Sequence, residues 1–169
     1  GDAENGYTFT NSHTPETINI EGTKTWNDAN DQDGKRPGKI TVNLLADGDI
    51  YATKEVTEAD GWKYNFTDLP KYKNGNKITY TITEDAVEDY QTLVNGYDIT
   101  NSYTPGKTSV SVTKTWDDAD NQDGKRARNI KVRLLADGNV VADSEVDLSD
   151  ANNWSHTWSD LDINKSGSP

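Results

Sequence analysis

Apolar and polar residues alternate along much of the chain, with the period of two that is typical of β-strands. The alternation and the turn signals between segments predict strands at about 17–26, 38–46, 50–56, 61–67, 77–84, 89–94 and 96–104. Asp47-Gly48 and Asn74-Gly75 indicate two-residue hairpin turns, because Asp-Gly and Asn-Gly accept the positive φ angles of such turns. About seven short strands in one repeat are typical of a β-sandwich, so the pattern predicts an all-β fold.

The chain also repeats itself, with an offset of about 90 residues that corresponds to a whole domain and not to a solenoid unit. We therefore expect residues 1–15 to be the last strand of a preceding repeat, 16–105 to be a complete β-sandwich, and 106–169 to be the N-terminal part of a second, truncated one. The repeated motifs are Lys24-Thr-Trp26 with Lys114-Thr-Trp116, Asp31 to Arg36 with Asn121 to Arg126, Leu44 to Gly48 with Leu134 to Gly138, and Thr10 to Pro15 with Thr100 to Pro105.

Three polar residues stand on otherwise apolar strand faces of the complete repeat. Lys24 lies between Ile20 and Trp26 on one face of the first strand, Glu84 ends the apolar face of the 77–84 strand, and Asn101 interrupts that of the last strand. Lysine is almost never fully buried unless it is paired. A shared interior position for these three side chains therefore calls for a chemical explanation.

One explanation is a covalent cross-link. Burial disfavours charged side chains, and a neutral Lys24 amine is a nucleophile. A protonated Glu84 would polarise the Asn101 carbonyl and pass its proton to the leaving ammonia. Attack on Asn101 Cγ would then give a Lys–Asn isopeptide bond, helped by the proximity that folding imposes. The alternative is a buried Lys–Glu salt bridge with Asn101 as a hydrogen-bond partner, and position alone leaves both open.

Composition narrows the function classes. The chain has 29 acidic and 17 basic residues and a net charge of −12, which argues against a nucleic-acid partner. It has no cysteine, so an extracellular location would require a staple other than a disulfide. No apolar run is long enough for a membrane span, and no signal-peptide pattern is present. The first residue is not Met, and we expect a piece of a longer protein.

Several motifs together resemble the Cna protein B-type (CnaB) domain of Gram-positive adhesins and pilins, in order and over essentially the whole chain. The resemblance implies tandem Ig-like (inverse-Ig) β-sandwiches that act as stalk repeats of a cell-wall-anchored, extracellular adhesin, without turnover activity as an enzyme. It implies that Lys24 and Asn101 form an autocatalytic isopeptide bond, with Glu84 as the proton shuttle. The motifs are Lys24 to Asp28, Asp33 to Pro37, Val42 to Gly48, Tyr80 to Asp85 and Ile99 to Pro105.

Two further sites are incomplete. Lys114 has no acid or asparagine partner before residue 169, and Asn11 lacks its own lysine and glutamate. We expect Lys114 to be a free amine and residues 106–169 to have exposed strand edges that could pair with another chain. One hypothesis is that residues 5–13 of a neighbouring molecule dock there without forming a bond. The expected partners are adjacent repeats in the same chain and a host matrix ligand bound by other domains.

The sequence gives less support to other kinds of site. Asp28, Asn30, Asp31 and Asp33 miss the EF-hand spacing, so a solvated turn is favoured over calcium. His13 and His156 are too few and too distant in sequence for a metal cluster or a catalytic triad. We therefore expect no metal and no cofactor. The three tryptophans Trp62, Trp154 and Trp158 could form a sugar-stacking platform, but their alternation favours a core. The alternative function, a binding module for host matrix or glycan, predicts an exposed aromatic patch.

Overall fold

The computed structural model describes residues 7–169, and the chain divides into two compact units, Gly1–Thr104 (unit 1) and Pro105–Pro169 (unit 2). Residues 1–6 of the predicted 1–15 strand lie outside the described residues. Residues 7–16 are exposed and form no strand. Because a strand requires a hydrogen-bonded neighbour, the role of this segment as the last strand of a preceding repeat stays a prediction.

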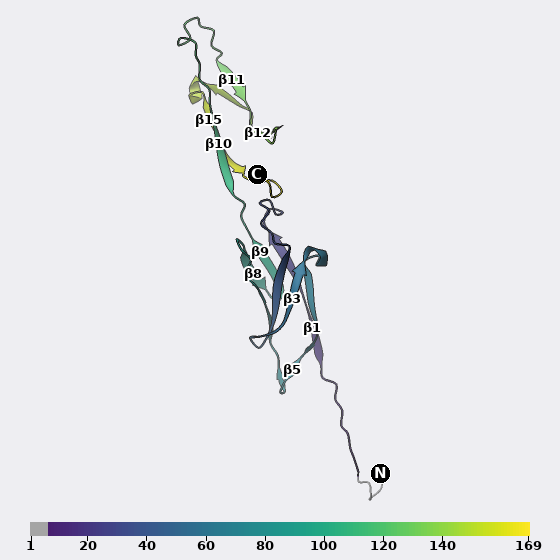
Figure 1. The fold of residues 1–169 in the computed structure, drawn as a ribbon. Coiled ribbons are helices and arrows are strands. Elements are labelled where there is room, and N and C mark those ends of the chain that lie inside the picture. Colours follow the sequence, from purple (N-terminus) through teal and green to yellow (C-terminus); the bar gives the residue numbers. More distant parts are fainter. Residues whose placement is uncertain (1–6) are drawn as a thin grey trace. The chain divides into compact units, whose positions relative to one another are not determined.

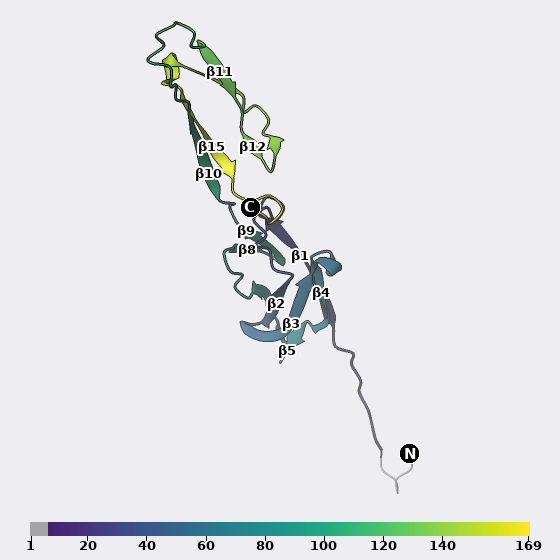
Figure 2. The same cartoon turned by 45° about the horizontal axis from the view of Figure 1, so that its top comes forward.

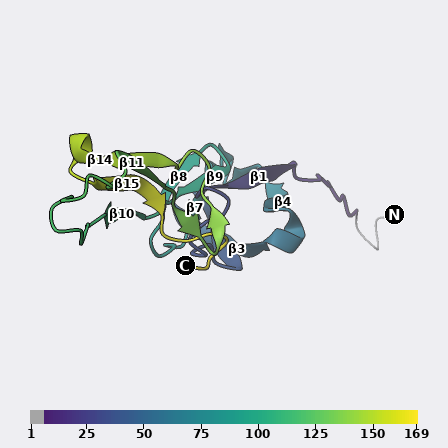
Figure 3. The same cartoon turned by 90° about the horizontal axis from the view of Figure 1, so that it is seen from above.

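Unit 1 contains two main sheets (Figure 1), one with strand order β4-β1-β9-β8 and one with order β3-β2-β7. Strand β1 runs parallel to β9, and the other pairings in these sheets are antiparallel. Strands β1, β9 and β8 lie side by side in Figure 3. The bounds are β1 Thr17–Asn27, β2 Lys39–Ala46, β3 Asp49–Thr57, β4 Lys63–Pro70, β5 Tyr72–Lys73, β6 Asn76–Lys77, β7 Tyr80–Glu84, β8 Gln91–Asn95 and β9 Asp98–Ser102, with a 3-10 turn η1 at Glu58–Asp60.

The core of unit 1 lies between the two sheets. Side chains that alternate along the strands meet there, and several are at most 2% exposed: Ile20, Val42, Leu44, Val56 and Ile99. Aromatic side chains of β4 and β7 belong to the same cluster of buried residues. This is the β-sandwich that the period-two pattern predicted, because each strand buries one of its two faces.

The seven predicted strands are confirmed to within a few residues. Both predicted hairpin turns are present: φ is 50° at Asp47 and 92° at Gly48, and 52° at Asn74 and 79° at Gly75, as a type I′ turn requires. The prediction placed the turn at Asn74-Gly75 but missed the two short strands beside it, β5 and β6. Each of them pairs only two residues, too few to leave an alternating pattern in the sequence.

Gly22 allows β1, β4 and β9 to come together. It pairs with Tyr64 of β4, whose hydroxyl donates a hydrogen bond to the carbonyl of Tyr97. A Cβ atom at residue 22 would collide with that carbonyl and with the Tyr64 ring. In unit 2 the equivalent pair is Val112 and His156, so a larger residue on the first strand faces a smaller ring.

Unit 2 consists of three two-stranded sheets within residues 105–169: β10-β15, β11-β14 and β12-β13 (Figure 2). Its core is thin, since Leu148 and Trp154 are the hydrophobic residues buried in that range. The assignment of unit 2 as part of a second sandwich stays a prediction. The bounds are β10 Lys107–Thr113, β11 Asn129–Val132, β12 Leu135–Ala136, β13 Asn139–Val140, β14 Val146–Ser149 and β15 Ser155–Asp162, with a 3-10 turn η2 at Asp150–Asn152.

Gly22→Ala should destabilise unit 1 by about 1–3 kcal/mol or more, because β9 and Tyr64 must move to admit the methyl group. Thermal unfolding followed by circular dichroism measures the change. The control is Gly38→Ala, whose Cβ would meet nothing within 4 Å and should leave the midpoint nearly unchanged. Equal midpoints for the two variants would contradict the close approach at Gly22.

Candidate functional site

Lys24 and Glu84 form an ion pair in the interior of unit 1. Lys24 is on the buried face of β1, and its Nζ lies 2.9 Å from Oε1 of Glu84, the last residue of β7. Both side chains are 0% exposed. Strand alternation directs both side chains inward. Lys24 shares the buried face of β1 with Ile20 and Gly22, and Glu84 shares that of β7 with Tyr80 and Ile82. The pair brings together two of the three residues that the sequence predicted.

Asn101, the third predicted residue, lies on the strand beside Lys24. In the parallel β1–β9 pair, Lys24 is opposite Ile99 and Trp26 is opposite Asn101. Lys24 and Asn101 are therefore diagonal neighbours on one buried face, which is within reach of a long side chain. Asn101 is 0% exposed, and neither Oδ1 nor Nδ2 has a hydrogen-bond partner in the described part of the chain. An unpaired buried amide costs about 1–3 kcal/mol, so this side chain needs an explanation.

Aromatic rings surround the amine. Lys24 Nζ is 3.8 Å from the centroid of the Trp26 ring, close enough for a cation–π contact. Trp26 in turn meets Trp62 and Tyr90 edge to face, with ring centroids 5.2 Å and 5.0 Å apart. These rings exclude water from one side of the amine, and the exclusion raises the energy of its charged form.

Burial lowers the pKa of Lys24 below its ordinary value, against the opposing effects of the hydrogen bond to Glu84 and of the Glu84 and Asp28 charges. A lowered pKa increases the fraction of neutral amine, the form that attacks a carbonyl. The arrangement thus holds a nucleophile, a carboxylate that can accept its proton, and an unpaired amide on the neighbouring strand.

Thr92 of β8 is a site residue that the sequence analysis missed. Its hydroxyl donates a hydrogen bond of 2.8 Å to Oε2 of Glu84, the oxygen that does not face Lys24. The segment Gln91–Asn95 has no clear alternation of apolar and polar residues, so Thr92 gave no signal. Thr92 pairs with Asn101 across β8 and β9, and this pairing would have shown that Thr92 points toward the site. The register of two strands cannot be derived from the sequence.

The loop between β1 and β2 covers the same end of unit 1. Asp28 is 1% exposed and accepts two hydrogen bonds from Arg36, of 3.0 Å and 2.7 Å, and one of 2.9 Å from the Tyr90 hydroxyl. The prediction of a solvated turn was therefore wrong for Asp28. Sequence spacing did not reveal that Arg36 folds back over the carboxylate and that Tyr90 arrives from a distant segment.

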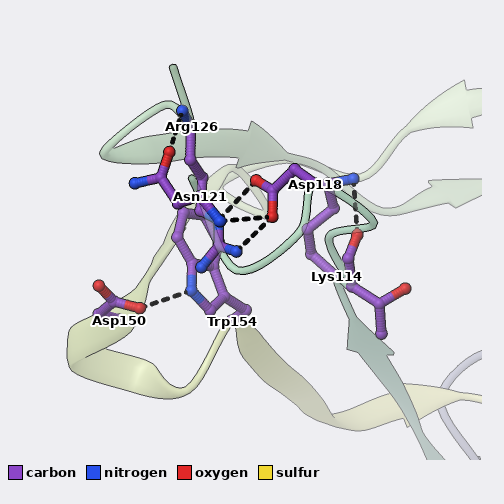
Figure 4. A network of polar contacts seen from close by, with 7 residues as sticks. Lys114, Asp118, Asn121, Arg126, Asp150 and Trp154 are labelled. Atoms are coloured by element: carbon purple, nitrogen blue, oxygen red, sulfur yellow. Dashed lines mark hydrogen bonds and ion pairs between the residues drawn. The ribbon is translucent and has the colours of Figure 1, made fainter. Parts of the chain in front are cut away.

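Unit 2 has the same loop. Arg126 donates two hydrogen bonds to Asp118, of 2.9 Å and 2.6 Å, and its backbone amide donates to Asn121 Oδ1 (Figure 4). In unit 1 the matching contact runs from the Arg36 amide to Asp31. Hydrogen bonding by Arg126 lowers the pKa of Asp118 to about 2. The loop thus forms in both units from its own sequence.

Lys114 and Asn11 are the residues of the two incomplete sites, and the described contacts bring neither of them to the partners that a complete site would have. Lys114 Nζ donates a hydrogen bond of 3.0 Å to the Thr115 carbonyl (Figure 4). The same Nζ atom lies 4.3 Å from the Trp116 ring centroid. No carboxylate of unit 2 is recorded in an ion pair with Lys114 among the described contacts. Asn11 is exposed in the segment without a strand. Docking of residues 5–13 on another molecule stays a prediction.

The remaining candidates have structural roles. Trp154 is buried and Trp62 packs against the unit 1 core, so the interpretation as core is confirmed for these two. Trp158 is half-buried against His156, and its assignment to a core stays a prediction. Within residues 7–169, no group of three or more His, Cys, Asp or Glu side chains could hold a metal ion. The expectation of no metal and no cofactor remains a prediction. Over the same range, the helical segments are all too short and polar to span a membrane.

The Asp28–Arg36 pair should make unit 1 sensitive to acid. Burial alone would raise the pKa of Asp28, but the hydrogen bonds from Arg36, the Asp31 amide and Tyr90 hold it below its ordinary value. The stabilisation is present above the unfolded-state pKa of about 3.9 and is lost as pH falls through the folded-state value. Urea unfolding as a function of pH measures this loss.

Asp28→Asn should cost about 3 kcal/mol at neutral pH, because it leaves Arg36 without its counter-charge, and should flatten the acid limb of the pH profile. The control is Asp89→Asn, since Asp89 is 45% exposed in its 3.2 Å pair with Lys35 and should matter by less than about 1 kcal/mol. An unchanged acid limb in Asp28→Asn would contradict the assignment.

Comparison with known proteins places this chain in a family. The model of the Cna protein B-type domain matches residues 20–102 and again residues 110–169. A collagen adhesin of Staphylococcus aureus is 56% identical over 158 residues, which are 94% of this chain and 13% of the adhesin. The chain thus spans a small part of that relative's length.

Two solved structures are also similar. The crystal structure of a single B repeat unit (B1) of the collagen-binding surface protein Cna of Staphylococcus aureus is 54% identical, with a TM-score of 0.52, over 90% of this chain and 81% of that one. A structure of two B repeat units (B1B2) of the same protein is 54% identical, with a TM-score of 0.55, over 92% of this chain and 42% of that one. The two matched segments and these identities show that the chain belongs to the Cna protein B-type domain family.

Proposed function

We propose that this chain is a stalk repeat of a cell-wall-anchored surface adhesin and that unit 1 closes itself with an isopeptide bond between Lys24 and Asn101. The observation that carries the proposal is the buried Lys24–Glu84 pair beside an Asn101 amide with no hydrogen-bond partner. A salt bridge alone would explain Lys24 and Glu84, but it gives no reason for an unpaired amide on the neighbouring strand. A cross-link to Asn101 gives that reason.

The proposed reaction is a single acyl transfer within the chain. Glu84 accepts a proton from Lys24 through the 2.9 Å contact of Oε1 with Nζ, which leaves the amine neutral. The nitrogen then attacks Asn101 Cγ, forming the Nζ–Cγ bond, while the Cγ–Nδ2 bond breaks. The leaving group takes up the proton held by Glu84 and the one lost by the attacking nitrogen, and departs as an ammonium ion, so the chain itself is lighter by one ammonia. Glu84 ends as it began, and because the bond persists there is no turnover.

The bond would change how unit 1 responds to force. The chain enters along β1 and leaves along the parallel neighbour β9. A link between Lys24 and Asn101 removes the intervening residues from the load-bearing path, so tension crosses the bond without unfolding the sandwich. In the loop-entropy treatment of disulfides, such a closure also stabilises the fold by about 4–5 kcal/mol. It would serve as the staple that a cysteine-free extracellular domain needs.

The proposed setting is the outer surface of a cell. A similar protein is a collagen adhesin, and a similar solved structure contains two B repeat units of one protein. We infer that units 1 and 2 are spacers next to further repeats of the same protein. Contact with a host matrix ligand would then belong to other domains of the parent protein.

The bond predicts a mass change. Under denaturing conditions the parent chain should weigh less than its sequence by one ammonia, and Glu84→Ala should have the full mass, because the proton shuttle is missing. Intact mass spectrometry measures both. The matched control is Lys114→Arg, which alters the equivalent lysine of unit 2 and should keep the deficit of one ammonia.

The full mass in the parent chain would overturn the proposal. A deficit in Glu84→Ala equal to that of the parent would remove Glu84 from the mechanism. A deficit of two would mean that Lys114 had also reacted, against the contacts described above.

The bond also predicts an unusual response to removal of a buried amide. Asn101→Ala should lower the free energy of unfolding by about 4–5 kcal/mol, because the closed loop is lost. Without a bond, deletion of an unpaired buried amide would relieve its desolvation and cost less. Urea unfolding distinguishes the two. Asn11→Ala, the same repeat position in the exposed segment, is the control and should not change unit 1.

A further inference from the structure

We propose that Thr92 is a positioning residue for the proton shuttle: its hydroxyl fixes the Glu84 carboxyl group so that the transferred proton is carried on Oε1, the oxygen that faces Lys24. The inference rests on the proposed function, since it concerns the same bond-forming reaction. It assigns a role to a side chain outside the lysine, glutamate and asparagine set, on a strand that contributes none of the three.

The register of the sheet places Thr92. Strand β8 pairs antiparallel with β9, and Thr92 is directly opposite Asn101. Residues that face each other across a strand pair point to the same side, so Thr92 points inward with Asn101. Thr92 is nevertheless exposed, because β8 is the edge strand of its sheet. Its side chain therefore lies at the boundary between solvent and the buried Glu84 carboxylate.

The two carboxylate oxygens of Glu84 have different donors. Oε1 accepts from Lys24 Nζ at 2.9 Å, and Oε2 accepts from the Thr92 hydroxyl at 2.8 Å. With the Thr92 hydrogen directed at Oε2, the proton that leaves Lys24 is received on Oε1. From there it faces the reacting atoms and can pass to the departing nitrogen of Asn101.

Removal of the hydroxyl would release this constraint. The carboxyl group could then rotate about its last side-chain bond, and a proton carried on the outer oxygen would lie away from the leaving group. In the reacting state Glu84 carries the proton and is neutral, and a hydrogen bond between neutral groups contributes about 0.5–1.5 kcal/mol. Its loss there corresponds to a bond-forming rate about twofold to tenfold lower.

The segment before β8 holds Thr92 in place. Tyr90, two residues earlier, packs its ring 5.0 Å from Trp26 and donates its hydroxyl to Asp28. The approach of the chain to β8 is thus fixed at the same end of the sandwich as Lys24. Thr92 is thus held by the packed Tyr90 before it and by its pairing with Asn101 of β9, and such support is what a precise hydrogen bond to Glu84 requires.

The test is the rate of bond formation in the full chain. Chains recovered from insoluble protein in denaturant, and first shown by their full mass to lack the bond, are refolded by dilution. Samples are stopped at intervals with acid, and intact mass spectrometry gives the fraction that has lost ammonia. Tryptophan fluorescence follows folding in parallel. We expect Thr92→Val to fold like the parent and to form the bond about twofold to tenfold more slowly. Thr92→Ser, which keeps the hydroxyl, should restore most of the rate.

The matched control is Thr81→Val, the same change at an exposed position of β7, which should react at the parent rate. A parent-like rate in Thr92→Val, or a rate in Thr92→Ser as low as in Thr92→Val, would overturn the assignment. If Thr92→Val does not fold, Thr92→Ala, which adds no bulk, takes its place under the same criteria. Full mass in the parent would instead refute the isopeptide bond itself, so the two failures are distinguishable.

Discussion

The structure of unit 1 depends on the cost of burying charge. Lys24 and Glu84 are withdrawn from solvent completely, and desolvating two ions is expensive unless each is well partnered. Neighbouring side chains supply partners for both charged groups. Trp26 covers the amine, and Thr92 occupies the second carboxylate oxygen. The Asn101 amide beside them has no hydrogen-bond partner in the described part of the chain, and covalent closure would make this arrangement permanent.

Comparison of the two units distinguishes features that depend on the nearby sequence from features that depend on long-range strand pairing. The loop with its Asp–Arg pair is present in both, at Asp28–Arg36 and at Asp118–Arg126, because the aspartate and the arginine lie within the same short loop. The site around Lys24 requires strands far apart in sequence. Lys114 has the same neighbours in sequence, but its amine contacts the carbonyl of the next residue. The lysine motif alone therefore does not create the site; long-range strand pairing does.

Much of the site was predictable from the sequence because strand alternation is a local signal. Lys24, Glu84 and Asn101 each interrupt an apolar face, so their inward direction followed without a structure. Thr92 was not predictable, because its inward direction depends on register with β9 and an edge strand carries little alternation. The burial of Asp28 was missed for a related reason. Tyr90, which donates to it from another segment, is brought there by tertiary packing that spacing does not encode.

Peptide mapping tests the central claim most directly. The full chain is digested with a protease under denaturing conditions, and the fragments are identified by tandem mass spectrometry. The account predicts a branched fragment in which a β1 peptide containing Lys24 is joined to a β9 peptide containing Asn101, lighter than their sum by one ammonia. Two separate linear peptides, with Lys24 and Asn101 both unmodified, would contradict the account.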